Sequence, residues 1–304
     1  MSRAFRSWRM FAIGVAVTFI ASDHATAQTS ASASQTGCAQ YRGDAARFHP
    51  CVVEAAKTFN PPRLPDGHPN FGGFWGRTVN SYDVEDHPAT FMIRAQKSMI
   101  VDPPDGKIPY QPWAAAQKKK NAELYLDPDA QCLLPGLPRA TGYMSDRLLI
   151  RQPKGYVIFI SGDHGNRIIP LNGRPHVGER IRLWNGDSRG RWEGDTLVVD
   201  VTNQTGKTWI DIAGNFASDT LHIVERYTLA DVDTLEYRAT LEDPKVFTRP
   251  WTIVTALLRN KGANDEGNEL WLESCHEGER DAQHLLATHD HYPGWTIIAP
   301  AAGR

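Results

Sequence analysis

The chain of 304 residues lacks the short motifs that identify the common catalytic and nucleotide-binding sites. It contains no GxSxG or SxxK nucleophile motif, no HExxH zinc motif, no Walker loop and no dinucleotide fingerprint. A basic excess is also absent, because 33 Lys and Arg face 35 Asp and Glu, for a formal net charge of −2. Such a chain has no electrostatic footprint for nucleic acid or anionic membranes. We therefore expect a small-molecule ligand, no nucleic-acid partner and no cofactor.

Long hydrophobic runs are absent except near the N-terminus, where Met10–Ala21 form an apolar stretch of about a dozen residues, as in a signal-peptide core. A basic segment with three arginines precedes the stretch, and the small-x-small sequence Ala25–Ala27 follows it. The stretch is too short to span a bilayer, which disfavours a membrane anchor. Residues 1–27 are therefore expected to be a cleavable secretory signal peptide, so that the mature chain is periplasmic or extracellular, without membrane insertion.

Cysteine is scarce, with four residues in the whole chain. In the oxidising compartment that an exported protein enters, four cysteines predict two disulfide bonds. Three pairings are possible. We favour Cys38 with Cys51, which closes a short local loop, and Cys132 with Cys275, which clips a segment before the β region to the last strand. A thiolate metal site is disfavoured because no CxxC spacing occurs.

The first half of the mature chain carries few strand signals. Residues 28–60 are expected to be a disordered leader followed by one short helix. The Pro- and Gly-rich segment Asn60–Gly76 is expected to be an ordered loop that leads Phe74 and Trp75 into a first strand. The strong helix formers of Gln111–Leu126, with a proline at the start, predict a helix.

Beyond Cys132, short runs of β-branched and aromatic residues alternate with Gly, Asn and Asp, which is typical of antiparallel strands joined by tight turns. No fixed-period repeat occurs, which disfavours a propeller or a solenoid. We expect residues 61–285 to form a single, mainly β domain, an antiparallel barrel or sandwich with one or two N-terminal helices, and residues 286–304 to form a C-terminal tail. The predicted strands are Leu148–Gln152, Tyr156–Ser161, Arg167–Leu171, Ile181–Trp184, Thr196–Thr202, Thr220–Leu229, Thr234–Glu242, Trp251–Leu258 and Glu269–Ser274.

One predicted hairpin joins Thr220–Leu229 to Thr234–Glu242. Strand alternation puts Glu225 on the face that carries the apolar residues, and matching the two apolar faces pairs Glu225 with Tyr237. The same register pairs Tyr227 with Leu235, Ile223 with Ala239, Leu221 with Leu241 and Arg226 with Glu236. An inward carboxylate is costly to ionise unless it is paired, so Glu225 with the Tyr237 hydroxyl is a candidate acid or base in the barrel interior. The alternative is that Glu225 pairs with an interior arginine or caps a backbone group.

A second candidate is the segment GDHGNR, which brings Asp163, His164 and Arg167 within six residues, with His176 shortly after. An aspartate beside a histidine fixes its tautomer, and an arginine suits an anionic substrate. The alternative is that Asp and Gly here only form a turn.

The C-terminal segment is rich in histidine and acidic residues, a composition that can bind zinc or copper. These residues are His276, Glu277, His284, His289, Asp290 and His291. None of the standard metalloprotease spacings occurs, so a solvated tail is favoured and no metal ligand is assigned.

Six sequence blocks, in this order along the chain, resemble a large family of uncharacterised secreted bacterial proteins with a RWEGDTLVV motif. The blocks are LPDGHPNFGGFW (Leu64–Trp75), CLLPGLPR (Cys132–Arg139), WNGDS (Trp184–Ser188), RWEGDTLVVDVTN (Arg191–Asn203), LHIVERY (Leu221–Tyr227) and EDPKVFTRPWT (Glu242–Thr252). The resemblance implies a periplasmic or extracellular β-rich domain and supplies no catalytic residues. The TLVV strand after a Trp-containing turn is also similar to calycin-like, lipocalin-type barrels.

Together these patterns predict a periplasmic β-barrel enzyme that acts on a small, partly apolar organic molecule by acid and base catalysis, as a lyase, isomerase or hydrolase. Glu225, His164 and Asp163 are the expected proton-transfer groups. The expected substrate contacts are Arg167, His176, Trp184, Trp192, Trp209 and Tyr237. A periplasmic carrier that binds such a ligand without chemistry is the alternative, and a structural envelope protein without a cavity is a third. Catalysis requires His164 and Glu225 to lie within about 8 Å of each other, so that both can reach one substrate.

Overall fold

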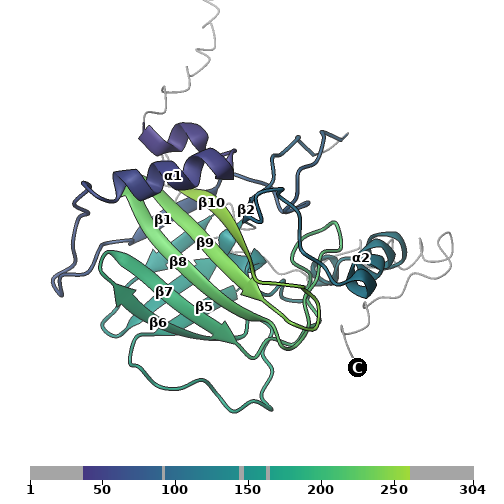
Figure 1. Cartoon of the computed structure of the whole chain (residues 1–304). Coiled ribbons are helices and arrows are strands. Elements are labelled where there is room, and N and C mark those ends of the chain that lie inside the picture. Colours follow the sequence, from purple (N-terminus) through teal and green to yellow (C-terminus); the bar gives the residue numbers. More distant parts are fainter. Residues whose placement is uncertain (1–36, 91–92, 144–146, 162–164, 261–304) are drawn as a thin grey trace, which may run out of the picture. The chain divides into compact units, whose positions relative to one another are not determined.

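Ten strands in the described part of the chain form one antiparallel sheet that curls into a nearly closed barrel (Figure 1). The computed structural model describes residues 37–90, 93–143, 147–161 and 165–260. The strand order is β5-β4-β3-β1-β10-β9-β8-β7-β6, and β2 pairs with β10 beside this path. The strands are β1 (Gly73–Arg77), β2 (Ile100–Asp102), β3 (Leu148–Arg151), β4 (Tyr156–Ser161), β5 (Gly165–Pro170), β6 (Asp187–Glu193), β7 (Thr196–Thr202), β8 (His222–Asp231), β9 (Thr234–Glu242) and β10 (Trp251–Arg259). The predicted mainly β barrel is confirmed.

Several predicted segments lie outside the described residues. They are the signal peptide at residues 1–27, the leader up to residue 36, the strand Glu269–Ser274 and the tail at residues 286–304. Among the helices that the structure describes, none is long and apolar enough to cross a bilayer.

Alternate residues of the central strands fill the barrel. Leu197, Val199 and Val201 of β7 are fully buried, and so are Leu235 and Tyr237 of β9. Burying an aliphatic or aromatic side chain of this size stabilises the fold by about 1.5–3 kcal/mol. The period of two that the sequence predicted for the hairpin therefore holds, because it decides which side chains the barrel encloses.

The register of the β8–β9 hairpin differs by two residues from the predicted one. Tyr227 pairs with Tyr237 instead of Leu235, because a bulge between Leu229 and Asp231 lengthens β8 and shortens the loop. A shift of two residues leaves every side chain on its predicted face, so the inward position of Glu225 is confirmed. The observed pairs are Glu225–Ala239, Ile223–Leu241, Arg226–Arg238 and Thr228–Glu236. The predicted cross-strand pair of Arg226 with Glu236 is therefore wrong.

The predicted strand Ile181–Trp184 is also wrong. Leu183 makes only an isolated bridge to Gln204, and the chain turns at Gly186, whose φ is +63°, before β6 begins. Hydrophobic alternation does not reveal β6, because its sequence DSRGRWE is almost entirely polar.

The end strands β5 and β6 approach through side chains. Arg167 on β5 donates from Nε and from Nη2 to Ser188 Oγ on β6, at 3.0 Å each. Gly190 on β6 lies so close to β5 that a Cβ there would be 2.8 Å from Ile169 Cγ2. Closure of the barrel at this seam thus depends on a buried arginine and a glycine.

Helix α1 (Ala45–Ala55) covers the outside of the barrel at β8, β10 and β2 (Figure 1). Its buried face carries Phe48 and Val52, which pack with Ala230 and Val254 of the strands. This packing accounts for the short helix that the sequence predicted in the N-terminal region.

The predicted disulfide between Cys38 and Cys51 is confirmed and joins the 3₁₀ turn η1 (Gly37–Tyr41) to α1. A bond that closes a loop of this size stabilises a fold by about 3 kcal/mol. The second predicted pairing, Cys132 with Cys275, involves a residue outside the described part of the chain.

Two further helices follow. The predicted helix Gln111–Leu126 is present as α2 (Pro112–Leu124). A 3₁₀ turn, η2 (Pro128–Gln131), leads toward α3 (Arg139–Gly142), whose four residues are all buried. Helix α3 fills part of the barrel interior, because Thr141 contacts Arg167, and Gly142 lies against the ring of Tyr237.

Replacement of Gly142 by alanine should destabilise the fold, because the new Cβ would lie 2.3 Å from Cε1 of the fully buried Tyr237. Overpacking of this kind costs roughly 1–3 kcal/mol. Urea denaturation measures the loss, with Gly178→Ala as the matched control, since no atom lies within 4 Å of a Cβ at that position. Equal stability of the two variants would contradict the tight fit of α3.

A buried carboxylate ties two loops together beside the barrel. Asp211 accepts hydrogen bonds from Val84 N at 2.9 Å and from Asn215 Nδ2 at 2.7 Å, and the same Asn215 amide donates to Asp83 at 3.1 Å. Burial, together with the negative charge of Asp83, raises the pKa of Asp211 from 3.8 to about 7.

This raised pKa makes stability depend on pH. Between the unfolded value of 3.8 and about 7, the folded state keeps a proton on Asp211 that the unfolded state has released. The free energy of unfolding should therefore fall as the pH rises through this window. Asp83→Asn removes the neighbouring charge and should lower the pKa of Asp211. In this variant the free energy of unfolding should stop decreasing at a lower pH than in the wild type. Denaturation of both proteins across the window measures the difference, and identical pH profiles would contradict the coupling.

Candidate functional site

The barrel interior holds a buried ion pair between Arg167 of β5 and Glu225 of β8. Nη1 of the guanidinium is 3.1 Å from Oε1 of the carboxylate, and Nη2 donates to Oε2. The Tyr237 hydroxyl donates to Oε1 at 2.8 Å. Nη1 also lies 3.1 Å from Thr141 Oγ1 and 3.4 Å from the Tyr227 hydroxyl. Protein groups therefore occupy both carboxylate oxygens and all three guanidinium nitrogens.

The electrostatics of this cluster fit a closed structural network. Burial works to lower the pKa of Arg167, but the charge and hydrogen bond of Glu225 together with the neighbouring Tyr227 and Tyr237 outweigh it, and the pKa of Arg167 is raised. Burial and the charge of Glu225 also raise the pKa of Tyr227 and of Tyr237 well above the ordinary value of 10.0. Both hydroxyls therefore keep their protons at neutral pH, and Tyr237 remains a donor. Of the two readings of Glu225, the geometry favours pairing with an interior arginine.

The other residues of the predicted catalytic group fall elsewhere. Asp163 and His164 lie outside the described residues. The expected separation of about 8 Å between His164 and Glu225 therefore stays a prediction. Arg167, predicted to contact an anionic substrate, has Glu225 as its partner.

The tryptophans predicted to line a cavity have different surroundings. Trp192 stacks on His68 with ring centroids 4.9 Å apart. Trp209 is buried and bridges to Phe216, whereas Trp184 is half-buried in the turn before β6. Their contacts do not define one common wall.

A chain of histidine and aspartate side chains lies at the partly exposed surface of β6, β7 and β8. His176 Nδ1 is 2.8 Å from Asp187 Oδ2, and His176 Nε2 is 2.8 Å from Asp200 Oδ1. The second oxygen of Asp200 is 3.0 Å from His222 Nε2. We call these four residues, in the order Asp187, His176, Asp200 and His222, the histidine relay.

The hydrogen bonds of the relay define its charges. Both ring nitrogens of His176 face carboxylate oxygens, which only accept, so the doubly protonated ring satisfies both bonds. Burial works to raise the pKa of Asp200, but the hydrogen bonds and the electrostatic attraction of His222 and His176 together outweigh it and hold the pKa below its ordinary value of 3.8. Asp200 is therefore an ionised carboxylate between two imidazole rings.

A pocket of about 450 Å³ lies beside the relay. Both histidines line it, together with Val177, Glu179, Arg182, Thr202, Asn203, Asp219, Thr220 and Leu221. The His222 side chain is 37% exposed, so its ring is accessible from the pocket. Its Nε2 is engaged by Asp200, which leaves Nδ1 for a ligand, since the nearest Glu242 oxygen is 3.9 Å away.

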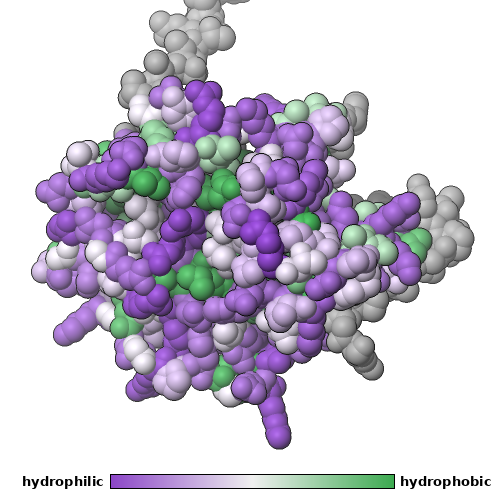
Figure 2. Space-filling view, viewed as in Figure 1, coloured by the Kyte–Doolittle hydropathy of each residue, from purple (hydrophilic) through white to green (hydrophobic). Residues whose placement is uncertain are grey.

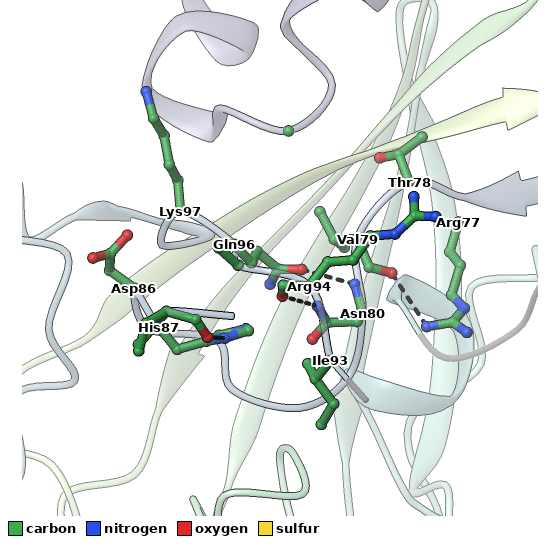
Figure 3. A pocket seen from close by; sticks show the side chains of 13 residues that line it. Arg77, Thr78, Val79, Asn80, Asp86, His87, Ile93, Arg94, Gln96 and Lys97 are labelled. Carbon is green, nitrogen blue, oxygen red and sulfur yellow. Dashed lines mark hydrogen bonds between the residues drawn. The ribbon is translucent and has the colours of Figure 1, made fainter. Parts of the chain in front are cut away.

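A second cleft, of about 860 Å³, lies where β1 ends and the chain continues to Lys97 (Figure 3). Its lining includes the cations Arg77, Arg94 and Lys97, together with Asp86 and His87. On the face drawn in Figure 2, hydrophilic side chains predominate and hydrophobic ones form only small patches.

Neither the relay nor any other group of His, Cys, Asp and Glu within the described residues is arranged to hold a metal ion. In the relay, nitrogen and oxygen atoms contact one another directly, so no space for an ion separates them. The C-terminal histidines considered as metal ligands lie outside the described part of the chain.

Comparison of the chain with protein-family models, with curated proteins and with solved structures gives no match. The resemblance of the six sequence blocks to secreted bacterial proteins stays a prediction.

Glu225→Gln should destabilise the protein strongly, because it leaves the Arg167 guanidinium buried without its counter-charge. Breaking a buried pair in this way costs about 3–5 kcal/mol. The control is Asp195→Asn, which breaks the Arg63–Asp195 pair at the surface, where both side chains are more than 40% exposed, and should change stability little. If denaturation gave the same stability for both variants, the interior pair would not be structural.

Proposed function

We propose that the protein is an exported enzyme that acts on a small organic molecule by acid and base catalysis, with His222 as the proton-transfer group. The observation that carries the proposal is Asp200, whose two oxygens contact His222 and His176 at 3.0 and 2.8 Å beside a pocket. A carboxylate that accepts from one ring nitrogen fixes the tautomer and leaves the other nitrogen as a base. The proposed reaction classes are those in which a base removes a proton, namely lyases, isomerases and hydrolases.

The relay supports uptake of a proton at His222. When Nδ1 of His222 accepts a proton from a substrate, the ring becomes positive next to the ionised Asp200. The charges then alternate along the chain, negative on Asp187 and Asp200 and positive on His176 and His222. Because opposite charges adjoin at every step, the protonated intermediate is stabilised without movement of the protein.

The pocket supplies groups that would orient a polar substrate. Arg182, which donates to Glu179 O and lies 3.6 Å from Asp219, contributes a guanidinium. The hydroxyls of Thr202 and Thr220 donate to Asn203 and Asp243, so their oxygens are left as acceptors for a substrate. The proposed catalytic residue is therefore His222 on the outer face of β8, in place of the interior Glu225 on the same strand. His176, which the sequence predicted as a substrate contact, is proposed as a positioning residue.

The disulfide supports export as part of the proposal. Disulfides such as Cys38–Cys51 persist in oxidising compartments, in agreement with the predicted signal peptide and a periplasmic or extracellular location.

His222→Gln should lower turnover strongly without unfolding the protein, because the side chain is partly exposed and its loss leaves the barrel interior intact. The exported protein is incubated with a mixture of small polar metabolites, and substrate loss is followed by mass spectrometry. Loss of general base catalysis should lower the rate about 10²–10⁴-fold. Asp200→Asn should also lower the rate, while His68→Gln, outside the relay, serves as the control.

Two outcomes would overturn the proposal. Turnover by His222→Gln equal to that of the wild type would remove this residue from the chemistry. Retention of a metabolite by the wild type without any turnover would favour the carrier instead of the enzyme.

A further inference from the structure

The cleft of Figure 3 is built from parts of the chain that the histidine relay does not use. It lies between the end of β1 with the following residues up to Asn80, the two stretches Asp86–Pro88 and Ile93–Lys97, and Gly43 before α1. Backbone hydrogen bonds in both directions between His87 and Gln96 hold the two stretches together. Its volume of about 860 Å³ is within the usual range for small-molecule sites.

Positive charge predominates in the cleft. The lining contains three cationic side chains and one carboxylate, namely Arg77, Arg94 and Lys97 against Asp86. Lys97 is paired with Asp44 at 2.6 Å, and Arg77 donates to Val79 O at 3.3 Å. The cleft is therefore suited to an anion.

Arg94 is the cation that is available to a ligand. Its guanidinium makes no hydrogen bond or ion pair with the residues that the structure describes, and in Figure 3 its side chain extends over the cleft toward Thr78 and Arg77. The backbone of Arg94 is anchored, because its carbonyl accepts from Asn80 Nδ2 at 3.4 Å. An anchored arginine with unused donors matches a carboxylate in bidentate geometry.

His87 is a buried residue at the edge of the cleft. The residue is 7% exposed, and its Nδ1 is 3.1 Å from Pro88 O, a pure acceptor, so Nδ1 carries the proton. The other nitrogen, Nε2, is buried and finds no partner among the described residues. Because this nitrogen is not accessible from the cleft, it makes no contact with a ligand there.

Apolar side chains complete the lining. Val79, Pro88, Ile93 and Ala95 offer surface to the non-polar part of a ligand. The lining also includes the polar residue Gln96. Its side chain is held in place because Oε1 accepts a hydrogen bond from the backbone N–H of Asn80 at 2.7 Å.

We propose that this cleft binds a small organic carboxylate with an apolar body, with Arg94 as its main anion contact. The cleft is a binding site separate from the relay, and its occupation requires no catalysis at His222.

Isothermal titration calorimetry with 4-hydroxybenzoate tests the proposal on the wild-type protein and on Arg94→Gln. The variant should fold normally, because Arg94 is exposed and its side chain supports no described contact. Its affinity should be at least about tenfold lower than that of the wild type. The matched control is Arg174→Gln, an exposed arginine outside the cleft, which should bind as the wild type does.

Comparison ligands separate the parts of the proposal. The neutral 4-hydroxybenzyl alcohol should bind at least about tenfold more weakly than the carboxylate, and His222→Gln should bind 4-hydroxybenzoate normally. The proposal is overturned if Arg94→Gln binds as tightly as the wild type, if the wild type binds no carboxylate at about 10 mM, or if inorganic phosphate binds as tightly as 4-hydroxybenzoate. Failure of this test leaves the relay's turnover assay unaffected.

Discussion

The ion pair between Arg167 and Glu225 is the interaction on which the barrel depends. An ionised pair removed from water loses several kcal/mol of hydration per ion, which only a nearly complete set of hydrogen bonds offsets. The partners that complete the set come from β6, β9 and α3, through Ser188, Tyr237 and Thr141. The pair therefore fixes the end strands against each other and seats α3 in the interior. A barrel that opened at the β5–β6 seam would leave these charges without partners.

Strands β6 and β8 each carry a residue of the interior network on one face and a residue of the histidine relay on the other. Residues two apart share a face of a strand, and neighbours in sequence do not. On β6, Ser188 points inward and its neighbour Asp187 points outward. On β8, Glu225 points inward and His222, three residues earlier, points outward. Because the inner face holds the strands in register, the outer face positions Asp200 between its two histidines. The stability of the interior pair and the geometry of the relay are consequences of one register.

The sequence predicted faces more reliably than partners. Alternation in β8 and β9 is local, so it placed Glu225 inside, but the bulge after Leu229 depends on the turn geometry and shifted the register by two residues. Arg167 and Glu225 are 58 residues apart, and only closure of the sheet brings them together. The relay was missed for the same reason, since Asp187, Asp200 and His222 come from three strands. One signal was available in the sequence, because Asp200 interrupts the apolar run LVVDV. A strand that is buried on both faces would carry no charged residue at this position.

The N-terminal disulfide constrains one wall of the cleft. Cys38–Cys51 encloses the turn that contains Gly43 and Asp44, and Gly43 lines the cleft. Asp44 caps α1 through Arg47 N, and its hydrogen bond with Lys97 lowers the pKa of the carboxyl below its ordinary value. The turn therefore stays anionic at neutral pH and holds Lys97 at the edge of the cleft. Because disulfides persist in oxidising compartments, the wall that faces Lys97 is fully constrained only where the Cys38–Cys51 bond is formed.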